Sequence, residues 1–378
     1  MDMIPYVEIR SKDTRKIIGL IEGAKIFFEY NYNGCGDFEI YCRSTPNSLK
    51  LLKNGNYVTI PNEVDFIDDA GNKYCNIWKI KKVQRQYSRS NGKFLIATGQ
   101  EAKCIVGQRI IRYVAVLNGS LTTSIQNKLF NPNIINPVDS NRKIDGFVFK
   151  PSTVSRTIVD DNGNPTSTQV TYDNLLDYTE SLYATYDCGA KLRLNLSDLT
   201  LCYFIYEGSD KSESIVFSRG NDNLLSSDYS EDTTNYMSYA LIGGEDDENG
   251  VRKVNSIDYG SSGIDRYELF VDAKDVSSKY QDENNEEQSM DDADYKALLK
   301  SKGFENLSEH VIERLFDGEI DPTNKRYKFN EHYSLGDLVG SKDTDIGNMA
   351  KVQVIKFTKV QDEKGYQEYF EHEVKEVK

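Results

Sequence analysis

The chain has 378 residues, more than one hydrophobic core usually holds, and this length predicts two to four domains. Its formal net charge of −14 argues against a protein that reads DNA sequence, because surplus carboxylates repel the phosphate backbone. Tyr and Phe number 25 and 16, whereas Pro numbers only 8, and this composition favours β structure.

No segment has the pattern of a targeting or membrane sequence. Residues 1–9 lack a basic region followed by an apolar one, so we expect no signal peptide. No apolar run approaches the roughly 18 residues of a membrane-spanning helix, so we expect no membrane anchor. The six cysteines include no C-x-x-C pair and are expected to be reduced and mostly buried. A disulfide between Cys35 and Cys42 is the alternative.

The first hundred residues alternate apolar and polar residues as short strands do. Segments 25–32 and 37–42 flank the glycine-rich Asn33–Gly36 and predict a hairpin. Trp78 alternates inward with Ile80, which predicts core packing rather than ligand stacking. Further strands are predicted at 57–60, 75–83 and 93–98. Together these strands predict a small antiparallel barrel or sandwich.

The middle of the chain mixes helices and strands. Apolar spacing predicts a short helix over 121–130, which Asn131 and Pro132 would stop, and a clearer helix over 172–186. Segments 190–195 and 199–206 predict a hairpin.

The last third begins with polar sequence and returns to strands. The acidic segment 281–294 predicts an exposed loop, a candidate contact for partner proteins. Two short helices are expected at 295–302 and 308–316, joined at Gly303. Strands are predicted from 327 to the end.

These last strands repeat a pattern of the first domain. Gly55-Asn-Tyr-Val58 matches Gly336-Asp-Leu-Val339, and in both places a hairpin follows. The pattern by itself leaves open whether the chain contains a duplication. The residues at which a strand would begin in both copies are Gly55, Asn56, Val58, Gly336, Asp337 and Val339.

Candidate catalytic and metal sites fail on spacing. The acidic residues around Arg266 could form a glycosidase pair, but a salt-bridged turn that uses Asp265 and Glu268 is the favoured interpretation. A calcium loop would need Asp at its first position and Glu at its twelfth, where Glu245 and Ser256 stand. No P-loop, dinucleotide-binding motif or nucleophile elbow is present. We therefore expect no enzyme, no metal and no cofactor.

Short motifs in a fixed order resemble the siphophage tail baseplate hub family, also called tail-associated proteins. Three polar stretches within 216–273 stand out because they lack His, Cys and Lys, residue types that catalytic or metal sites usually need. The motifs that carry the resemblance are Gly107–Ile111, Asn174–Tyr178, Tyr206–Asp210, Val216–Ser218, Asn223–Leu225, Gly243–Gly244, Asp265–Glu268, Val271–Ala273 and Tyr333–Val339.

The resemblance implies a mainly β fold with minor α, built from two similar tube-type antiparallel β-barrel domains and two peripheral domains. The barrels would be 1–108, and 206–245 joined with 325–378; the peripheral domains would be 109–205, and 246–324 with its short helices and acidic loop. Residues expected at the joints between domains are Asn223, Leu224, Leu225, Gly243, Gly244, Asp265, Arg266, Glu268 and Asp272.

The resemblance also implies a structural virion protein at the tail tip, made in the host bacterial cytoplasm. As a homotrimer it would place six similar barrels against a sixfold tail tube or distal tail ring. Tape-measure protein and tail fibre or receptor-binding proteins would be further partners. DNA would pass through the channel without specific binding. Longer family members carry a fibre or lytic extension, and we expect those roles to lie in other proteins.

Two alternatives stay open at this point. A cell-surface carbohydrate-binding or hydrolysing β-protein would show an aromatic-lined pocket with a carboxylate pair, and would be monomeric. The hub of a contractile injection system or a tail-like bacteriocin would share the fold.

Overall fold

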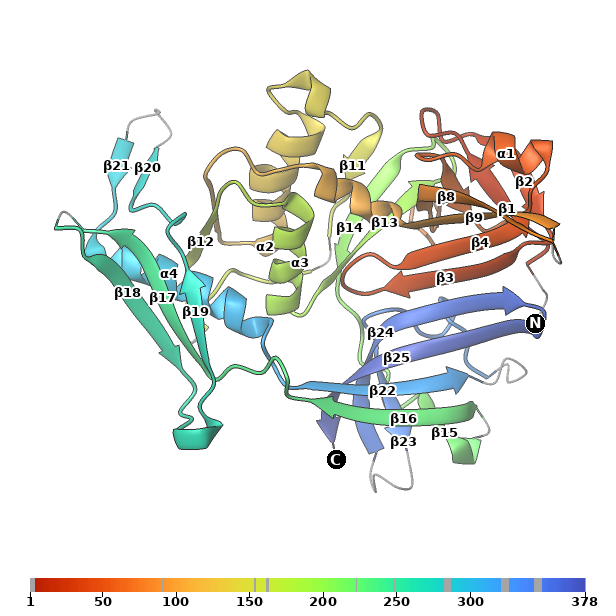
Figure 1. Ribbon diagram of the computed structural model, residues 1–378. Helices are drawn as coiled ribbons and strands as arrows, with labels where there is room; N and C mark the ends of the chain where they lie inside the picture. The colour runs from red at the N-terminus through yellow and green to blue at the C-terminus, as the bar shows by residue number, and fades with distance from the viewer. Residues whose placement is uncertain are drawn as a thin grey trace.

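The computed structural model describes residues 4–89, 92–152, 154–160, 163–221, 223–247, 249–281, 287–320, 326–342 and 349–377 (Figure 1). Strands dominate and helices are few, so the mainly β fold expected from composition is confirmed. In this part of the chain no helix is long and apolar enough to cross a membrane. The six cysteines are free.

One large sheet contains strands from both ends of the chain. Its N-terminal strand group consists of β1 (Tyr6–Arg10), β2 (Ile17–Glu22), β3 (Lys25–Asn31), β4 (Asp37–Arg43), β5 (Tyr57–Thr59), β8 (Trp78–Ser88) and β9 (Gly92–Glu101). Its C-terminal strand group consists of β15 (Val216–Ser218), β16 (Leu224–Asp232), β22 (Glu313–Ile320), β23 (Leu338–Lys342), β24 (Met349–Asp362) and β25 (Gly365–Val377).

The two groups have matching strand orders. The hydrogen-bonded path runs β16-β22-β25-β24-β3-β4-β9-β8-β5-β1-β2, and β23 pairs with β24 on one side and β15 on the other. The order β3-β4-β9-β8-β5 thus corresponds to β16-β22-β25-β24-β23. The pairings among the described residues close neither group into a ring, so the two barrels stay a prediction.

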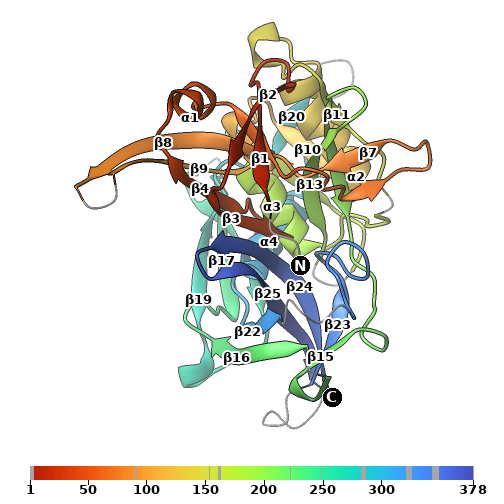
Figure 2. The same cartoon turned by 90° about the vertical axis from the view of Figure 1, so that its right-hand side faces the viewer.

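Strand β3 meets β24 at the centre of this sheet, as both views show (Figures 1 and 2). The pairing is antiparallel and runs from Asn31 opposite Lys356 to Ile26 opposite Gln361. A single apolar core lies under both groups, since buried residues of β3 and β8 and of β24 and β25 belong to one cluster. The groups are therefore halves of one folded body.

The middle of the chain forms a second core beside the sheet. A five-stranded sheet has the order β11 (Phe147–Phe149), β14 (Leu201–Tyr206), β13 (Gly189–Asn195), β7 (Lys73–Cys75) and β6 (Phe66–Ile67). With it pack a pair of strands, β10 (Ala115–Asn118) and β12 (Ser167–Val170), and two helical segments, α2 (Leu121–Ser124) and α3 (Leu175–Thr185). The predicted helix over 172–186 and the predicted hairpin are confirmed.

The helix that begins with α2 continues past its predicted end. Residues Ile125–Ile135 form wider, π-type turns with Pro132 inside them. The Asn133 side-chain amide donates to the Leu129 carbonyl at 2.8 Å, so a carbonyl near the proline is satisfied by a side chain. The prediction that Asn131 and Pro132 stop the helix was wrong, because the chain passes through the proline in these wider turns.

A third unit is inserted between β16 and β22. It contains the sheet β18 (Arg252–Asp258), β17 (Tyr239–Asp246) and β19 (Glu268–Asp272), the hairpin β20 (Lys279–Gln281) and β21 (Glu287–Ser289), and helix α4 (Asp292–Ser308). Asp232 pairs with Glu313 where the chain leaves and re-enters the large sheet. We call residues 233–312 the distal unit; Figure 1 shows it at the far left of the molecule.

Two predictions for this region were wrong. The segments 295–302 and 308–316 are not separate helices, since α4 runs through Gly303, where a Cβ would lie 2.6 Å from Ile242. Residues 313–320 form β22, because pairing with β16 and β25 overrides the local helical pattern. β22 thus lies in the large sheet, although its residues fall in the predicted peripheral range 246–324. Of the acidic segment 281–294, residues 282–286 lie outside the described part, and most of the rest is strand or helix.

His372 lies in the core of the C-terminal strand group without a hydrogen-bond partner on either ring nitrogen in the described part. Its ring centroid is 4.0 Å from that of Phe370. Burial lowers the pKa of His372 from 6.5 to about 3. The folded state therefore stays unprotonated while the unfolded chain gains a proton below pH 6.5.

We expect this residue to reduce stability as the pH falls below 6.5. Between pH 7.5 and 5.5, His372 should lower the free energy of unfolding by about 1.4 kcal/mol, and His372→Phe should remove this contribution. Urea unfolding of both chains at the two pH values measures the difference. Equal losses in the two chains would show that His372 is not buried in its neutral form.

Candidate assembly site

The two predicted strand starts have the same backbone geometry. Gly55 and Gly336 have φ values of +92° and +88°, which glycine adopts freely and other residues only with strain. The Gly55 amide donates to the Ile80 carbonyl at 2.8 Å, and the Gly336 amide donates to the Val354 carbonyl at 2.7 Å. Each glycine turns the chain so that the next strand pairs beside a long hairpin strand.

The residue after each glycine completes the same turn. The carbonyls of Asn56 and Asp337 accept from the amides of those two hairpin residues, at 2.9 and 3.0 Å. Both side chains are buried, and each accepts a backbone amide: Lys12 donates to Asn56 Oδ1 at 3.2 Å, and Ser209 to Asp337 Oδ1 at 2.8 Å. Asn56 and Asp337 thus hold neighbouring segments at equivalent places.

The register of the strands repeats as well. Val58 pairs with Trp78, and Val339 pairs with Val352. Two residues further along, each hairpin strand has a bulge in its pairing. The bulges lie between Ile80 and Lys82 in β8 and between Val354 and Lys356 in β24. The internal repeat is confirmed in hydrogen bonds and register, while the role of these residues in assembly stays a prediction.

The junction of β3 and β24 is reinforced by a charged and aromatic cluster. The Tyr30 hydroxyl donates to Glu63 Oε1 at 2.9 Å, and Lys359 Nζ lies 2.5 Å from the same oxygen. Lys359 also lies 5.2 Å from the Tyr30 ring centroid. Trp78 and Phe357 contact that ring edge-on, with centroids at 5.1 and 6.3 Å. Burial, with the nearby Glu63, raises the pKa of Tyr30 well above its usual range, so the hydroxyl stays a donor.

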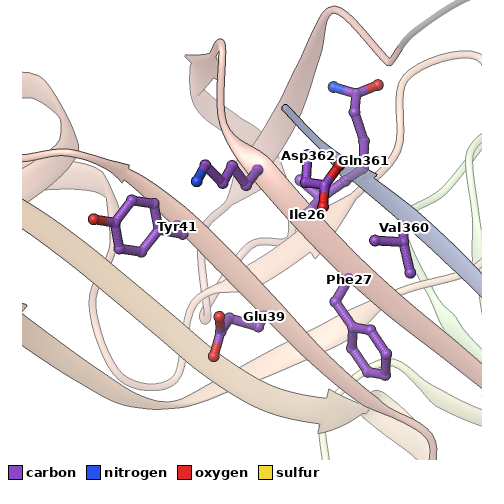
Figure 3. A pocket seen from close by; sticks show the side chains of 8 residues that line it. Ile26, Phe27, Glu39, Tyr41, Val360, Gln361 and Asp362 are labelled. Carbon is purple, nitrogen blue, oxygen red and sulfur yellow. The ribbon is translucent and has the colours of Figure 1, made fainter. Parts of the chain in front are cut away.

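A pocket of about 300 Å³ lies where β3 and β4 meet the end of β24 (Figure 3). Phe27 and Val360, on neighbouring strands, line one part of it, and Glu39 and Tyr41 on β4 line another. Lys25 lies 5.3 Å from the Tyr41 ring centroid. Both strand groups therefore build the pocket.

The first predicted joint, residues 223–225, fixes the start of β16. Asn223 is buried; its side-chain amide donates to the Val216 carbonyl at 2.9 Å and its oxygen accepts from the Ser218 amide at 2.9 Å. Leu224 enters the core, whereas Leu225 lies in a bulge and is 57% exposed. The segment closes the loop between β15 and β16.

The second predicted joint, the glycine pair, allows two large side chains to approach β17. Arg252 donates to the Gly243 and Gly244 carbonyls at 2.8 and 3.0 Å and pairs with Asp272. A Cβ on Gly244 would lie 2.4 Å from the Tyr295 hydroxyl, which accepts from the Glu245 amide at 2.7 Å. These contacts tie α4 and β19 to β17 inside the distal unit.

At the third predicted joint, the described ion pairs of Arg266 include the expected Glu268 and, in place of the expected Asp265, Asp258. Arg266 binds Asp258 at 2.8 Å and Glu268 at 2.6 Å. Asp265 lies in a short turn, Gly263–Asp265, and the described ion pairs of Arg266 do not include it. The predicted salt bridge to Asp265 was therefore wrong, because Asp258 on strand β18 is better placed to bind Arg266. Arg266 also lies 3.9 Å from the ring centroid of Tyr239, where β17 begins.

Of the residues that fasten β3 to β24, the sequence singled out only Trp78, whose predicted core packing is confirmed. The other members, Tyr30, Glu63 and Lys359, lie far apart in the sequence. The only signal for such a cluster was their aromatic and charged residue types. Within the described ranges no group of three or more His, Cys, Asp or Glu residues is placed to hold a metal ion. The arrangement as a whole consists of strand pairings, ion pairs and buried turns within the chain.

The strand start at Gly336 gives a stability prediction with an internal control. A valine there would strain the backbone and place its Cβ 2.4 Å from the Tyr32 ring, whereas at Gly55 the closest atom is a flexible Lys12 carbon at 3.4 Å. We expect Gly336→Val to destabilise the protein by about 2 kcal/mol more than Gly55→Val. Chemical denaturation of both variants measures this, and equal losses would contradict the close packing of Tyr32.

Comparison with known proteins gives the chain a family and a fold. Residues 6–369 match the family described as Siphovirus ReqiPepy6 Gp37-like protein. No curated protein matches the chain.

Two solved structures share the fold over nearly their whole length. The tail protein from Neisseria meningitidis MC58 has a TM-score of 0.55 and 13% identity, with 97% of this chain and 96% of that one covered. The prophage MuSo2 43 kDa tail protein from Shewanella oneidensis has a TM-score of 0.54 and 12% identity, with 97% and 98% covered. Because the family match spans nearly all of the sequence, this protein belongs to the Siphovirus ReqiPepy6 Gp37-like family.

Proposed function

We propose that the protein is a structural component of a siphophage or prophage tail, the trimeric baseplate hub at the tail tip. The observation that carries the proposal is the repeated strand order with its repeated turn, register and bulge. One chain presents two similar units, so three chains present six, which suits contact with a sixfold ring. The family and the fold shared with two tail proteins support a tail role.

The hub would join the tail tube, or the distal tail ring, to the tip and form the channel for DNA ejection. The net charge of −14 suits such a channel, because a surface of like charge keeps a duplex from adhering as it passes. The loops of the distal unit, which projects from the large sheet, would contact tape-measure or fibre proteins. The protein would act through its interfaces and would not be an enzyme.

The pocket at the junction bears on the rival carbohydrate-binding interpretation. It has the aromatic and acidic residues that a sugar site needs, including Tyr41 and Glu39. However, Phe94 stacks on the Tyr41 ring at 4.8 Å, and Lys25 lies over the same ring. The ring is engaged by neighbours within the sheet, which disfavours sugar stacking there.

Particles provide the direct test of the hub. A phage that carries an epitope-tagged chain should bind antibody at one tail end, and image averaging of purified tails should show three copies around the axis. Gly336→Val should leave particles without tail tips, whereas Gly55→Val should be less damaging. An antibody signal along the whole tail, or none on purified tails, would overturn the proposal.

A further inference from the structure

β3 and β24, the two strands of the central junction, each have a counterpart in the other strand group. Among the described strands, these two counterparts are not paired with each other as β3 and β24 are. By position in the two strand orders, β24 corresponds to β8, and β3 corresponds to β16. β24 pairs with β3 inside the chain. In the part of the chain that is described, the equivalent edge of β8 and the outer edge of β16 pair with no strand.

The unpaired edge of β8 is long and accessible. β5 pairs with β8 only at Trp78 and Lys79, and beyond the bulge at Ile80 the described partner of β8 is β9 alone. From Lys82 to Ser88 every side chain is exposed except the half-buried Val83. Figure 2 shows this hairpin projecting from the body. An open edge of this length is a template for another strand.

The outer edge of β16 has the opposite chemistry. It forms the border of the large sheet in Figure 1. Tyr229 and Leu225 are 38% and 57% exposed there. Residues 224–232 contain three carboxylates and no basic residue, whereas residues 81–89 contain four basic residues and no acidic one. The two edges thus attract each other, while a pairing of either edge with itself would bring like charges together.

We propose that the β8 edge of one copy pairs antiparallel with the β16 edge of a second copy, in the register that β24 uses with β3. The inference rests on the proposed hub and specifies how its copies join. Each copy offers one edge of each kind, so the contact is head-to-tail and can close into a ring.

The repeated bulges set the register. Lys82 and Lys356 both follow the bulge, so β8 aligns with β24 from there. The pairings of β4 with β9 and of β22 with β25 then align β4 with β22. The pairings of β3 with β4 and of β16 with β22 align β3 with β16, so that Asn31 is equivalent to Asp232. The pairs expected between copies are Lys82 with Asp232, Val83 with Glu231, Gln84 with Ser230, Arg85 with Tyr229, and Gln86 with Asp228.

This register brings opposite charges together. Lys82 faces Asp232 directly. Arg85 corresponds to Lys359, which lies over Tyr30 in the internal junction, and Tyr30 corresponds to Glu231. Arg85 would therefore reach Glu231 diagonally, beside the Arg314 that already binds this carboxylate at 2.6 Å. The exposed Tyr229 would be covered at the same time.

A cross-link tests the register. In the internal junction Tyr32 N donates to Ile355 O, so hydrogen-bonded pairs alternate from there and the pair of Thr358 with Glu29 is a non-hydrogen-bonded one. Side chains approach most closely at such pairs. The equivalent pair between copies is Gln84 with Ser230. We expect Gln84→Cys/Ser230→Cys to form disulfide-linked dimers and trimers, in the purified protein at high concentration and in assembled tails.

The matched control moves one cysteine along the same strand. Ser88→Cys/Ser230→Cys places the thiols four residues out of register and should yield at least tenfold less cross-linked product. Equal cross-linking of the two variants, or no cross-linking of Gln84→Cys/Ser230→Cys in tails, would overturn the pairing. Trimers that form without this cross-link would overturn the proposed strand pairing but not the proposed hub. A chain missing from purified tails would instead overturn the hub.

A charge exchange tests the same contact without new thiols. Lys82→Glu should raise the dissociation constant of the assembly about tenfold, because it places like charges opposite each other. Asp232→Lys should do the same. Both changes in one chain should restore assembly, since every head-to-tail contact then contains the exchanged pair. Sedimentation equilibrium measures all three, and a double variant weaker than either single one would contradict the pairing of these two residues.

Discussion

The antiparallel contact between β3 and β24 is the constraint on which the rest of the molecule depends. It joins segments from opposite ends of the chain into one sheet over one core. Its backbone hydrogen bonds are supplemented by buried aromatic contacts around Tyr30 and by the ion pair of Lys359 with Glu63. Because a strand pairing of this kind has a fixed register, it also fixes the orientation of the two strand groups.

The other two parts of the molecule attach to loops of this sheet. The middle core is reached through the segment between β5 and β8, which supplies β6 and β7, and through the chain beyond β9. The distal unit replaces the short turn that connects β3 to β4 in the N-terminal group. Insertions at loops leave the strand order intact, since loops tolerate added length far better than sheets do. Two similar groups can thus carry different additions.

The motifs that resemble tail hub proteins act mostly through buried turns and close packing. Asn223 and Asp337 bind backbone amides, Gly244 makes room for Tyr295, and Arg266 connects two strands. Asn223 and Asp337 are buried, where polar side chains are costly without partners, and both have partners. This explains why polar stretches without catalytic residue types can define a fold.

Local patterns in the sequence determined the β character, the hairpin at 25–42, the helix over 175–185 and the repeat of Gly55 at Gly336, because turn chemistry and alternation act over a few residues. Only the tertiary structure decided that Glu313–Ile320 is a strand, that α4 continues through Gly303, that Arg266 selects Asp258, and that β3 adjoins β24. Each of these depends on side chains or strand edges far away in the sequence. The physical reason is that a strand edge, a packing contact or an ion pair takes its partner from whatever the fold brings within reach, and local sequence does not encode that partner.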